Sequence, residues 1–167
     1  RQYHNLTHSF AVHGITAENP KIDIATMIGR KDKIVNQFTG GITQLFKANK
    51  VSTISGFASV KANRVVTIKT QDGTVSEITG KHIILATGST PIELPFAKFD
   101  NKLILDNAGA LDISAVPKRL GVIGAGVIGL ELGSVWNRLG SDVIILEGLS
   151  EFLASADADI TKVAARE

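Results

Sequence analysis

Three glycines and one acid in the last third of the chain have the spacing of a dinucleotide-binding motif. Gly124, Gly126 and Gly129 form the pattern GxGxxG, and Glu147 follows 18 residues after the last of them. The first glycine of such a motif permits a tight turn from strand to helix, the second lets the backbone approach a pyrophosphate, and the third lets the helix pack closely on the strands. An acid at this distance can accept hydrogen bonds from the ribose hydroxyls of the same nucleotide.

The residues around these glycines predict the strand, helix and strand that the motif needs. An apolar strand is predicted over residues 120–123, followed by an amphipathic helix over 127–139 that Gly140 ends as its C-cap. A second apolar strand, over 143–146, ends at Glu147. The N-terminus of the helix offers N–H groups and the positive end of its dipole to phosphates. This context favours a dinucleotide site over an ordinary structural glycine turn.

The acid also indicates which dinucleotide is bound. A carboxylate at Glu147 would repel the 2′-phosphate of NADP, and no arginine follows it until Arg166. We therefore predict NAD rather than NADP. We expect Trp136, which lies on the predicted helix, to pack in the interior rather than to stack on a base.

Composition and charge argue against several classes of protein. The 167 residues are 44% hydrophobic and 20% charged with a formal net charge of +2, so no concentrated basic face is expected for nucleic acid. No apolar run is long enough to span a bilayer, and the first residues do not resemble a secretion signal. The absence of cysteine means that this chain cannot itself perform thiol chemistry. His4, His8 and His13 have no acid or cysteine at ligand spacing, so we expect surface histidines and no metal site.

The first half of the chain predicts a long helix with one apolar face. Asp23 is its predicted N-cap, and the apolar spacing continues to Phe46. Gly40 and Gly41 inside it would each cost about 1 kcal/mol relative to alanine, so we expect a close backbone approach or a local break there. We predict that the apolar stripe is core rather than a surface for a partner. The stripe consists of Ile24, Met27, Ile28, Ile34, Val35, Phe38, Ile42, Leu45 and Phe46.

After Asn49 the pattern changes to the alternation of short antiparallel strands. Strands are predicted over 51–55, around Val60, over 64–70 and over 74–78. Asp72-Gly73 is predicted to supply the positive φ angles of a tight hairpin turn between the last two. A small meander therefore follows the long helix.

A continuous apolar run then predicts a strand that is covered on both faces. It spans residues 82–86 and stops at Thr87-Gly88-Ser89, whose hydroxyls and backbone N–H groups make a favourable ligand position at a strand end. A connector bracketed by Pro91 and Pro117 follows, in which residues 103–105 are predicted as one more strand. We place a domain boundary within residues 114–118.

The run VIGAGVIGLELGSVWNRLGS, residues 122–141, resembles the NAD-binding motif of the dihydrolipoamide dehydrogenases, within the pyridine nucleotide–disulfide oxidoreductases. The resemblance extends upstream and covers most of the chain from residue 22 to residue 147. Four upstream segments carry it: 39–47 (TGGITQLFK), 54–58 (ISGFA), 83–89 (IILATGS) and 107–111 (NAGAL).

The resemblance implies an α/β fold class, with parts of two Rossmann-like nucleotide-binding domains (the FAD/NAD(P)-binding fold) and a small antiparallel β meander. Residues 1–116 would be a partial FAD-binding domain, and residues 117–167 the N-terminal part of an NAD-binding domain. Ala58 stands where the family often has glycine. Val127 would lie beside the flavin ring and Glu131 near the nicotinamide. The implied NAD contacts are Gly124, Ala125, Gly126, Val127, Ile128, Gly129, Glu131 and Glu147, and the implied FAD contacts are Ala58, Thr87, Gly88 and Ser89.

The implied activity is FAD-dependent oxidation of dihydrolipoamide with NAD as hydride acceptor. Such enzymes are homodimers that serve the lipoyl-bearing acyltransferase of a 2-oxo acid dehydrogenase complex, in bacterial cytoplasm or the mitochondrial matrix. The family's own FAD-binding GxGxxG, redox-active cysteine pair, His–Glu pair and dimerisation domain lie outside the matched region. We therefore expect an internal fragment that is inactive by itself. The alternatives are a related flavoenzyme, such as a mercuric or glutathione reductase or a transhydrogenase, and a non-catalytic NAD-binding module.

Overall fold

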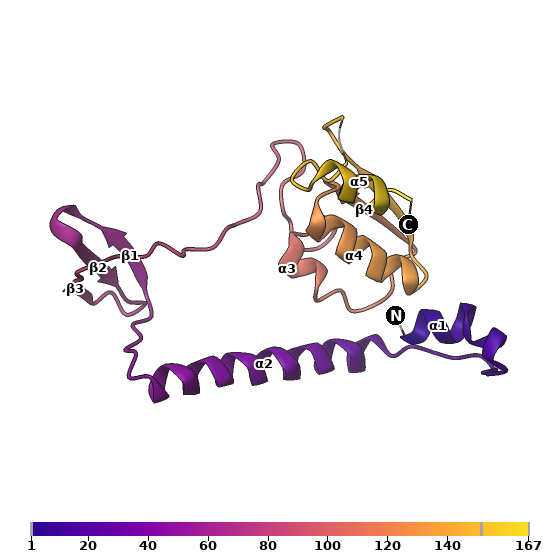
Figure 1. The fold of residues 1–167 in the computed structure, drawn as a ribbon, viewed down its shortest axis with the longest axis horizontal. Helices are drawn as coiled ribbons and strands as arrows, with labels where there is room; N and C mark the ends of the chain where they lie inside the picture. The colour runs from indigo at the N-terminus through magenta and orange to yellow at the C-terminus, as the bar shows by residue number, and fades with distance from the viewer. Residues whose placement is uncertain (1, 151, 167) are drawn as a thin grey trace. The chain divides into compact units, whose positions relative to one another are not determined.

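The computed structural model describes residues 2–150 and 152–166. The chain forms two compact units, one made of residues 1–32 and 91–167 and the other of residues 33–90 (Figure 1). The first holds a parallel pair of strands and the second a three-stranded antiparallel sheet. The α/β fold class with a small antiparallel meander is confirmed. The domain boundary within residues 114–118 stays a prediction.

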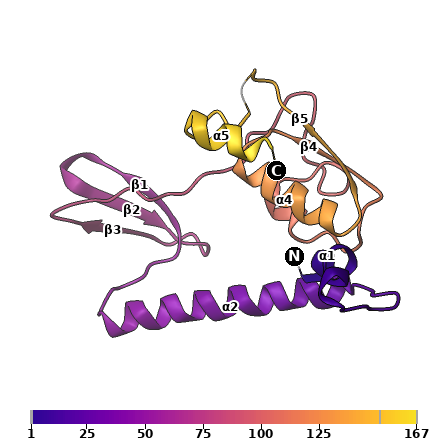
Figure 2. The ribbon, with the colours of Figure 1, turned by 45° about the vertical axis from the view of Figure 1, so that its right-hand side comes forward.

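A strand–helix–strand motif forms the centre of the first unit. β4 (Arg119–Ile123) and β5 (Asp142–Leu146) pair in parallel along their whole length. α4 (Val127–Arg138) connects them and lies along the pair in both ribbon views (Figure 2). Alternate residues of the two strands are half-buried on the face that α4 covers, and the others are exposed. The three elements therefore form as the sequence predicts, with one face of the sheet covered.

The C-terminal end of α4 shows why the helix stops where it does. Gly140 has φ 109°, a conformation that glycine adopts without strain. Its N–H donates to the carbonyl of Asn137 at 2.9 Å, and the N–H of Ser141 donates to the carbonyl of Trp136 at 3.0 Å. This pair of bonds is the Schellman motif, which satisfies carbonyls that a helix end leaves unpaired. The predicted role of Gly140 in ending the helix is confirmed.

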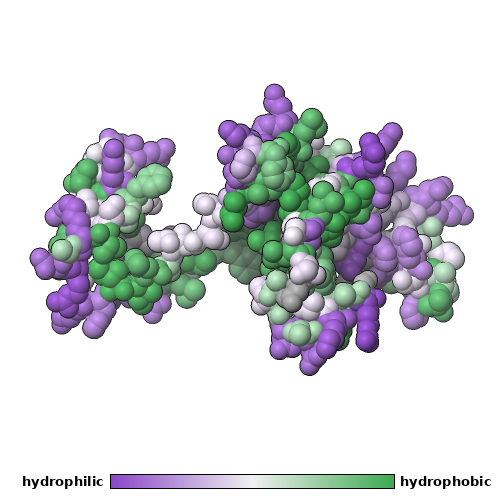
Figure 3. Space-filling view, turned by 90° about the horizontal axis from the view of Figure 1, so that it is seen from above, coloured by the Kyte–Doolittle hydropathy of each residue, from purple (hydrophilic) through white to green (hydrophobic). Residues whose placement is uncertain are grey.

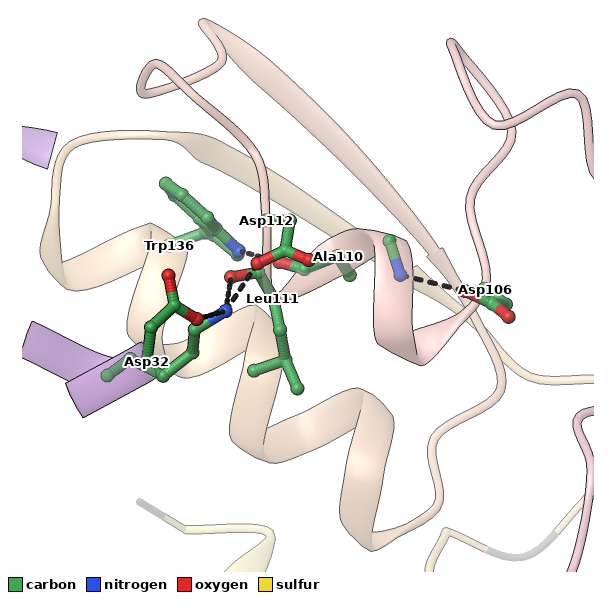
Figure 4. Close-up of polar contacts among 8 residues, drawn as sticks. Asp32, Asp106, Ala110, Leu111, Asp112 and Trp136 are labelled. Carbon is green, nitrogen blue, oxygen red and sulfur yellow. Dashed lines mark hydrogen bonds and ion pairs between the residues drawn. The ribbon is translucent and has the colours of Figure 1, made fainter. Parts of the chain in front are cut away.

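Trp136 anchors α4 in the interior of the first unit. Its side chain is 2% exposed, and its Nε1 donates to the carbonyl of Ala110 at 3.4 Å (Figure 4). Ala110 closes α3 (Asn107–Ala110), a single turn whose N-cap Asp106 accepts a hydrogen bond from the N–H of Gly109 at 2.8 Å. The prediction that the tryptophan packs in the interior is confirmed.

The remaining helices of the first unit are short, apart from the beginning of α2 (Ile24–Ala48), which continues into the second unit. Lys31 of α2 donates to Asp112 and to the carbonyl of Leu111, both directly after α3, and lies 3.0 Å from Asp32 (Figure 4). No helix within the described part of the chain is long and apolar enough to cross a membrane. The short helices are α1 (Gln2–His8), the 3₁₀ helix η1 (Phe10–His13) and α5 (Ala158–Ala164).

The second unit contains the predicted meander. β1 (Phe57–Val60), β2 (Val65–Lys69) and β3 (Val75–Thr79) form an antiparallel sheet in the order of the chain. A 3₁₀ turn, η2 (Ala62–Arg64), connects the first two strands. Ile68 of β2 is 4% exposed and is the main buried apolar residue of this sheet. The sheet is therefore held mainly by its hydrogen-bonded ladders rather than by a deep core.

The hairpin between β2 and β3 turns at Asp72-Gly73, as predicted, but with a different geometry. The N–H of Thr70 donates to the carbonyl of Thr74 at 2.9 Å, and the N–H of Gly73 donates to the carbonyl of Thr70 at 3.0 Å. Gly73 has φ 87°, whereas Asp72 does not have a positive φ. Expecting positive φ at both residues was therefore wrong, because the loop has three residues and needs only one left-handed position.

Three predicted strands do not form. Residues 51–55, 82–86 and 103–105 have no strand structure, and the side chains of Ile84 and Leu103 are each 91% exposed. An apolar run becomes a strand only when another strand offers its N–H and C=O groups, and none of the described strands pairs with these segments. The predictions of strands at these three places were wrong for this chain.

The long helix α2 begins where the sequence predicts, but it differs from the prediction in its regularity and in its burial. Asp23 caps it by accepting a hydrogen bond from the N–H of Thr26 at 3.1 Å. The helix continues without a break through Gly40 and Gly41, and a Cβ on either glycine would meet nothing within 4 Å. Much of the apolar stripe is exposed, including Phe38 at 71%, so the prediction that it is core was wrong for this chain. Exposed large hydrophobic residues occur in other parts of the chain as well, and Figure 3 shows hydrophobic areas, in green, on the face that it draws.

Candidate functional site

The glycine-rich segment forms a tight turn between β4 and α4. Gly124, the residue after β4, has φ 103°, which a residue with a side chain rarely adopts. Its N–H donates to the carbonyl of Leu146 at 2.7 Å, so the turn is attached to the end of β5. The turn therefore lies beyond the carboxyl ends of both parallel strands, where ligands bind in open α/β sheets.

Gly126 is the N-cap of α4 and faces open space. Its backbone is extended, with φ −79° and ψ 175°, and an added Cβ would meet nothing within 4 Å. No side chain within the described residues caps this helix. The N–H groups of the first turn of α4, including those of Val127 and Ile128, are therefore available to an anion, as a pyrophosphate requires.

Gly129 is required for a different reason, the closeness of the helix to the turn. A Cβ at this position would lie 2.2 Å from the carbonyl oxygen of Gly124 and 3.1 Å from the Cγ1 of Val122. One turn later, a Cβ on Gly133 would lie 3.5 Å from side-chain atoms of Val143 and Ile145. The three glycines of the motif thus meet the three requirements of a dinucleotide turn, and the residues present fit such a ligand.

Glu147 points toward the glycine-rich turn. Its Oε2 accepts a hydrogen bond from the N–H of Ala125 at 2.8 Å, and its Oε1 accepts one from the N–H of Leu149 at 2.9 Å. The N–H groups of Leu149 and Ala125, in that order of effect, hold the pKa of the Glu147 carboxyl below its usual value. Each oxygen keeps a second lone pair for a ligand hydroxyl. The acid is therefore ionised near neutral pH and lies beside the turn.

The structure brings the predicted NAD residues together around one turn. Ala125 is 4% exposed, whereas Val127 and Ile128 are 59% and 52% exposed on the first turn of α4. Glu131 follows one turn later and is exposed. The contacts of these residues with a nicotinamide nucleotide stay predictions.

The predicted FAD residues are not brought together in the same way. Ala58 lies on β1 opposite Ile68, and Thr87, Gly88 and Ser89 lie in an exposed segment without regular structure. No hydrogen bond within the described residues joins these two places. The residues present do not by themselves form a flavin pocket, and their contacts with FAD stay predictions.

The N-terminal histidines lie on or beside α1. The rings of His4 and His8 stack with their centroids 4.4 Å apart, and His13 ends η1. In the described part of the chain, no group of three histidines, cysteines or acids is placed to hold a metal ion.

Sequence reasoning missed two backbone partners of the site. The carbonyl of Leu146 and the N–H of Leu149 hold the turn and the acid, but backbone groups leave no mark in a residue pattern. It also missed α3, which could have been predicted because Asp106 is a favourable N-cap residue before Asn107.

Comparison with known proteins agrees with this geometry. Residues 3–167 match the family described as pyridine nucleotide-disulphide oxidoreductase. A dihydrolipoyl dehydrogenase of Cupriavidus necator is 48% identical over 166 residues, which are 99% of this chain and 35% of that protein. The mitochondrial dihydrolipoyl dehydrogenase of Pisum sativum is 47% identical over 160 residues, which are 96% of this chain and 32% of that protein.

A solved structure is similar in three dimensions. LpdA from Mycobacterium tuberculosis superposes with a TM-score of 0.79 at 26% sequence identity, over 93% of this chain and 35% of that one. The chain spans about a third of the length of the relatives that it matches. The family model, the two relatives and the Rossmann-like turn agree, and the chain belongs to the pyridine nucleotide-disulphide oxidoreductase family.

Proposed function

We propose that the glycine-rich turn binds NAD in a full-length protein that oxidises dihydrolipoamide with FAD. The names of the two relatives, both dihydrolipoyl dehydrogenases, support the substrate. The observation that carries the choice of NAD is the Glu147 carboxylate, which lies 2.8 Å from the N–H of Ala125. An ionised acid at this place receives the ribose hydroxyls of NAD and repels the 2′-phosphate of NADP.

The chain contributes binding and orientation to the proposed reaction. N–H groups at the N-terminus of α4 bind the pyrophosphate, and Glu147 accepts the ribose hydroxyls. Val127, the first residue of α4, is proposed to lie beside the flavin ring, and Glu131, one turn later, is proposed to lie near the nicotinamide. When bound, NAD would supply the hydride acceptor: in the net reaction dihydrolipoamide gives up two electrons and two protons, NAD takes both electrons and one proton, and the second proton reaches solvent.

The thiol chemistry of this reaction needs residues from outside the chain. Exchange between dihydrolipoamide and an enzyme disulfide requires thiolates, and the chain contains no cysteine. We therefore propose that the chain is inactive by itself. We also propose FAD contacts at Ala58 and residues 87–89, a homodimer, and a lipoyl-bearing acyltransferase as partner. One relative is mitochondrial and another is bacterial, which supports the mitochondrial matrix or the bacterial cytoplasm as the location.

A second candidate is another flavoprotein disulfide reductase or a transhydrogenase of the same family. It is favoured by the similarity to RclA from Escherichia coli, a structure described as an HOCl-induced flavoprotein disulfide reductase, which superposes with a TM-score of 0.67 at 27% sequence identity over 98% of this chain and 35% of that one. Steady-state assays of the full-length protein with dihydrolipoamide, oxidised glutathione, mercuric ion and NADPH as substrates separate these reactions. Turnover of dihydrolipoamide with NAD above all others supports the first proposal.

The experiment that tests the nucleotide is Glu147→Arg in the full-length protein. We expect the ratio of kcat/KM for NAD to that for NADP to fall by about tenfold or more, because a ribose contact is lost and the 2′-phosphate gains a cation. Glu93→Arg is the matched control, since the Glu93 carboxylate accepts a hydrogen bond from the N–H of Phe99 in a different loop. An unchanged ratio in Glu147→Arg would contradict the ribose role.

A further inference from the structure

Two neighbouring hydrogen bonds attach the glycine-rich turn to the end of β5. The N–H of Gly124 donates to the carbonyl of Leu146 at 2.7 Å, and the N–H of Ala125 donates to the Glu147 carboxylate at 2.8 Å. The second oxygen of that carboxylate accepts the N–H of Leu149 at 2.9 Å. One side chain therefore joins the turn to the loop that follows β5.

We propose that Glu147 is a positioning residue for the pyrophosphate as well as a ligand of the ribose. This inference rests on the proposed NAD function. By fixing the peptide N–H of Ala125, the carboxylate holds the backbone between Gly124 and Gly126 in the conformation that the diphosphate needs. Glu147 thereby strengthens the binding of a part of the ligand that it does not touch.

The composition of the turn explains why such a support matters. Gly124 and Gly126 have wide conformational freedom, and nothing lies within 4 Å of where their Cβ atoms would be, so neighbouring side chains do not confine them. Ordering a flexible loop on binding costs affinity, and a loop held in its bound conformation avoids that cost. Charge-assisted hydrogen bonds to backbone N–H groups are among the stronger ones that a side chain can make.

The burial of Ala125 supports the same interpretation. Ala125 is 4% exposed, so its N–H has little access to water and depends on the Glu147 carboxylate for a hydrogen-bond partner. Replacing the carboxylate by an amide removes the negative charge that strengthens both bonds and one of the two acceptor oxygens, so the N–H of Ala125 loses either its acceptor or the charge of that acceptor. A partly buried donor without an acceptor is unfavourable, and the turn would move to expose it.

The test uses two ligands that differ only in the ribose hydroxyls. ADP and 2′,3′-dideoxyadenosine 5′-diphosphate are titrated by calorimetry into full-length wild-type protein, Glu147→Gln and the matched control Glu93→Gln. Glutamine keeps the size of the side chain but has only one acceptor oxygen. We expect Glu147→Gln to weaken the dideoxy ligand by about tenfold, the loss typical of one hydrogen bond to a charged group. Glu93→Gln should leave both ligands unchanged.

Two further measurements separate positioning from a general loss of structure. In the unligated protein, hydrogen exchange of the Ala125 amide should be slow in wild type and faster in Glu147→Gln, with the exchange of β2 unchanged. In steady-state kinetics, the KM for NAD should rise in Glu147→Gln while kcat at saturating NAD stays at the wild-type value. A variant that is only less folded would lower kcat instead.

The outcomes distinguish this inference from the proposed function. If Glu147→Gln weakens ADP but not the dideoxy ligand, the acid acts only on the ribose, so the positioning role is overturned and the proposed function stands. If neither ligand is affected, both roles of Glu147 are overturned. If wild-type protein binds neither ligand, the proposed nucleotide site fails, and the positioning role fails with it.

Discussion

Two apolar runs of this chain are each followed within two residues by a glycine, yet only one of them becomes a strand. Residues 120–123 lie in β4 and are followed by Gly124, whereas residues 82–86 form no strand and lead to Thr87 and Gly88. Both glycines have positive φ angles, 103° and 73°. A glycine with a positive φ therefore follows both runs, and this feature does not decide which run is a strand.

The difference lies in the neighbours that each run finds within the chain. β4 pairs with β5, which follows it by one helix, and that helix covers one face of the pair. The run at 82–86 pairs with none of the described strands, and Ile84 is 91% exposed. A dinucleotide turn thus forms where the strand, the helix and the second strand are all close in sequence.

The largest effect expected from this comparison is on stability. Trp136→Ala should destabilise the first unit by about 3–5 kcal/mol, because it removes a large side chain that is 2% exposed and donates to Ala110. Ile84→Ala should stay within about 0.5 kcal/mol of wild type, because Ile84 is exposed. Urea unfolding of the purified chain measures both. Equal losses in the two variants would show that residues 82–86 are packed after all.

The next effect is on binding at the turn. Gly126→Val should weaken NAD by about 100-fold or more, or ~2.7 kcal/mol, because the side chain fills the open space in front of the turn. Folding should be retained, since a Cβ there meets nothing within 4 Å. Gly121→Val on β4 is the control, because its Cβ also has room and valine suits a strand. If calorimetry shows that Gly126→Val binds NAD with normal affinity, the proposal that this turn binds NAD is contradicted.

A smaller loss is expected where the helix approaches the turn. Gly129→Ala should cost about 1–3 kcal/mol of stability, because its Cβ would lie 2.2 Å from the carbonyl oxygen of Gly124 and the backbone must shift. Thermal unfolding detects this loss, and Gly148→Ala, whose Cβ meets nothing within 4 Å, is the control. A melting temperature of Gly129→Ala equal to that of the control would contradict the close contact.

The smallest effect has the opposite sign. Gly40→Ala should stabilise α2 by about 1 kcal/mol, because the helix is regular there and a Cβ meets nothing within 4 Å. Circular dichroism during thermal unfolding measures the gain. A loss of stability would instead indicate that Gly40 lies against another element, as the cost of a glycine inside a helix had suggested.

The site was more predictable than the fold around it. The turn, the helix ended by Gly140 and the acid after β5 follow from residue types, since each depends on local backbone sterics or on a terminus. The direction of Glu147 toward Ala125 did not follow from residue types, because its acceptor role depends on where β5 ends beside β4. The flavin contacts at Ala58 and residues 87–89 were implied by the family resemblance, and they stay predictions because no hydrogen bond within the described residues joins these two places.

The sequence alone determined the positions of the glycine turn, the caps at Asp23 and Gly140, and the hairpin at Gly73, because these depend on interactions within a few residues. Only the tertiary structure decided which apolar segments are covered. Burial and strand pairing are interactions between distant parts of a chain, and hydrophobicity shows that a residue can be buried without showing what lies against it. For this reason residues 120–123 and 82–86 are both apolar runs and yet have different structures.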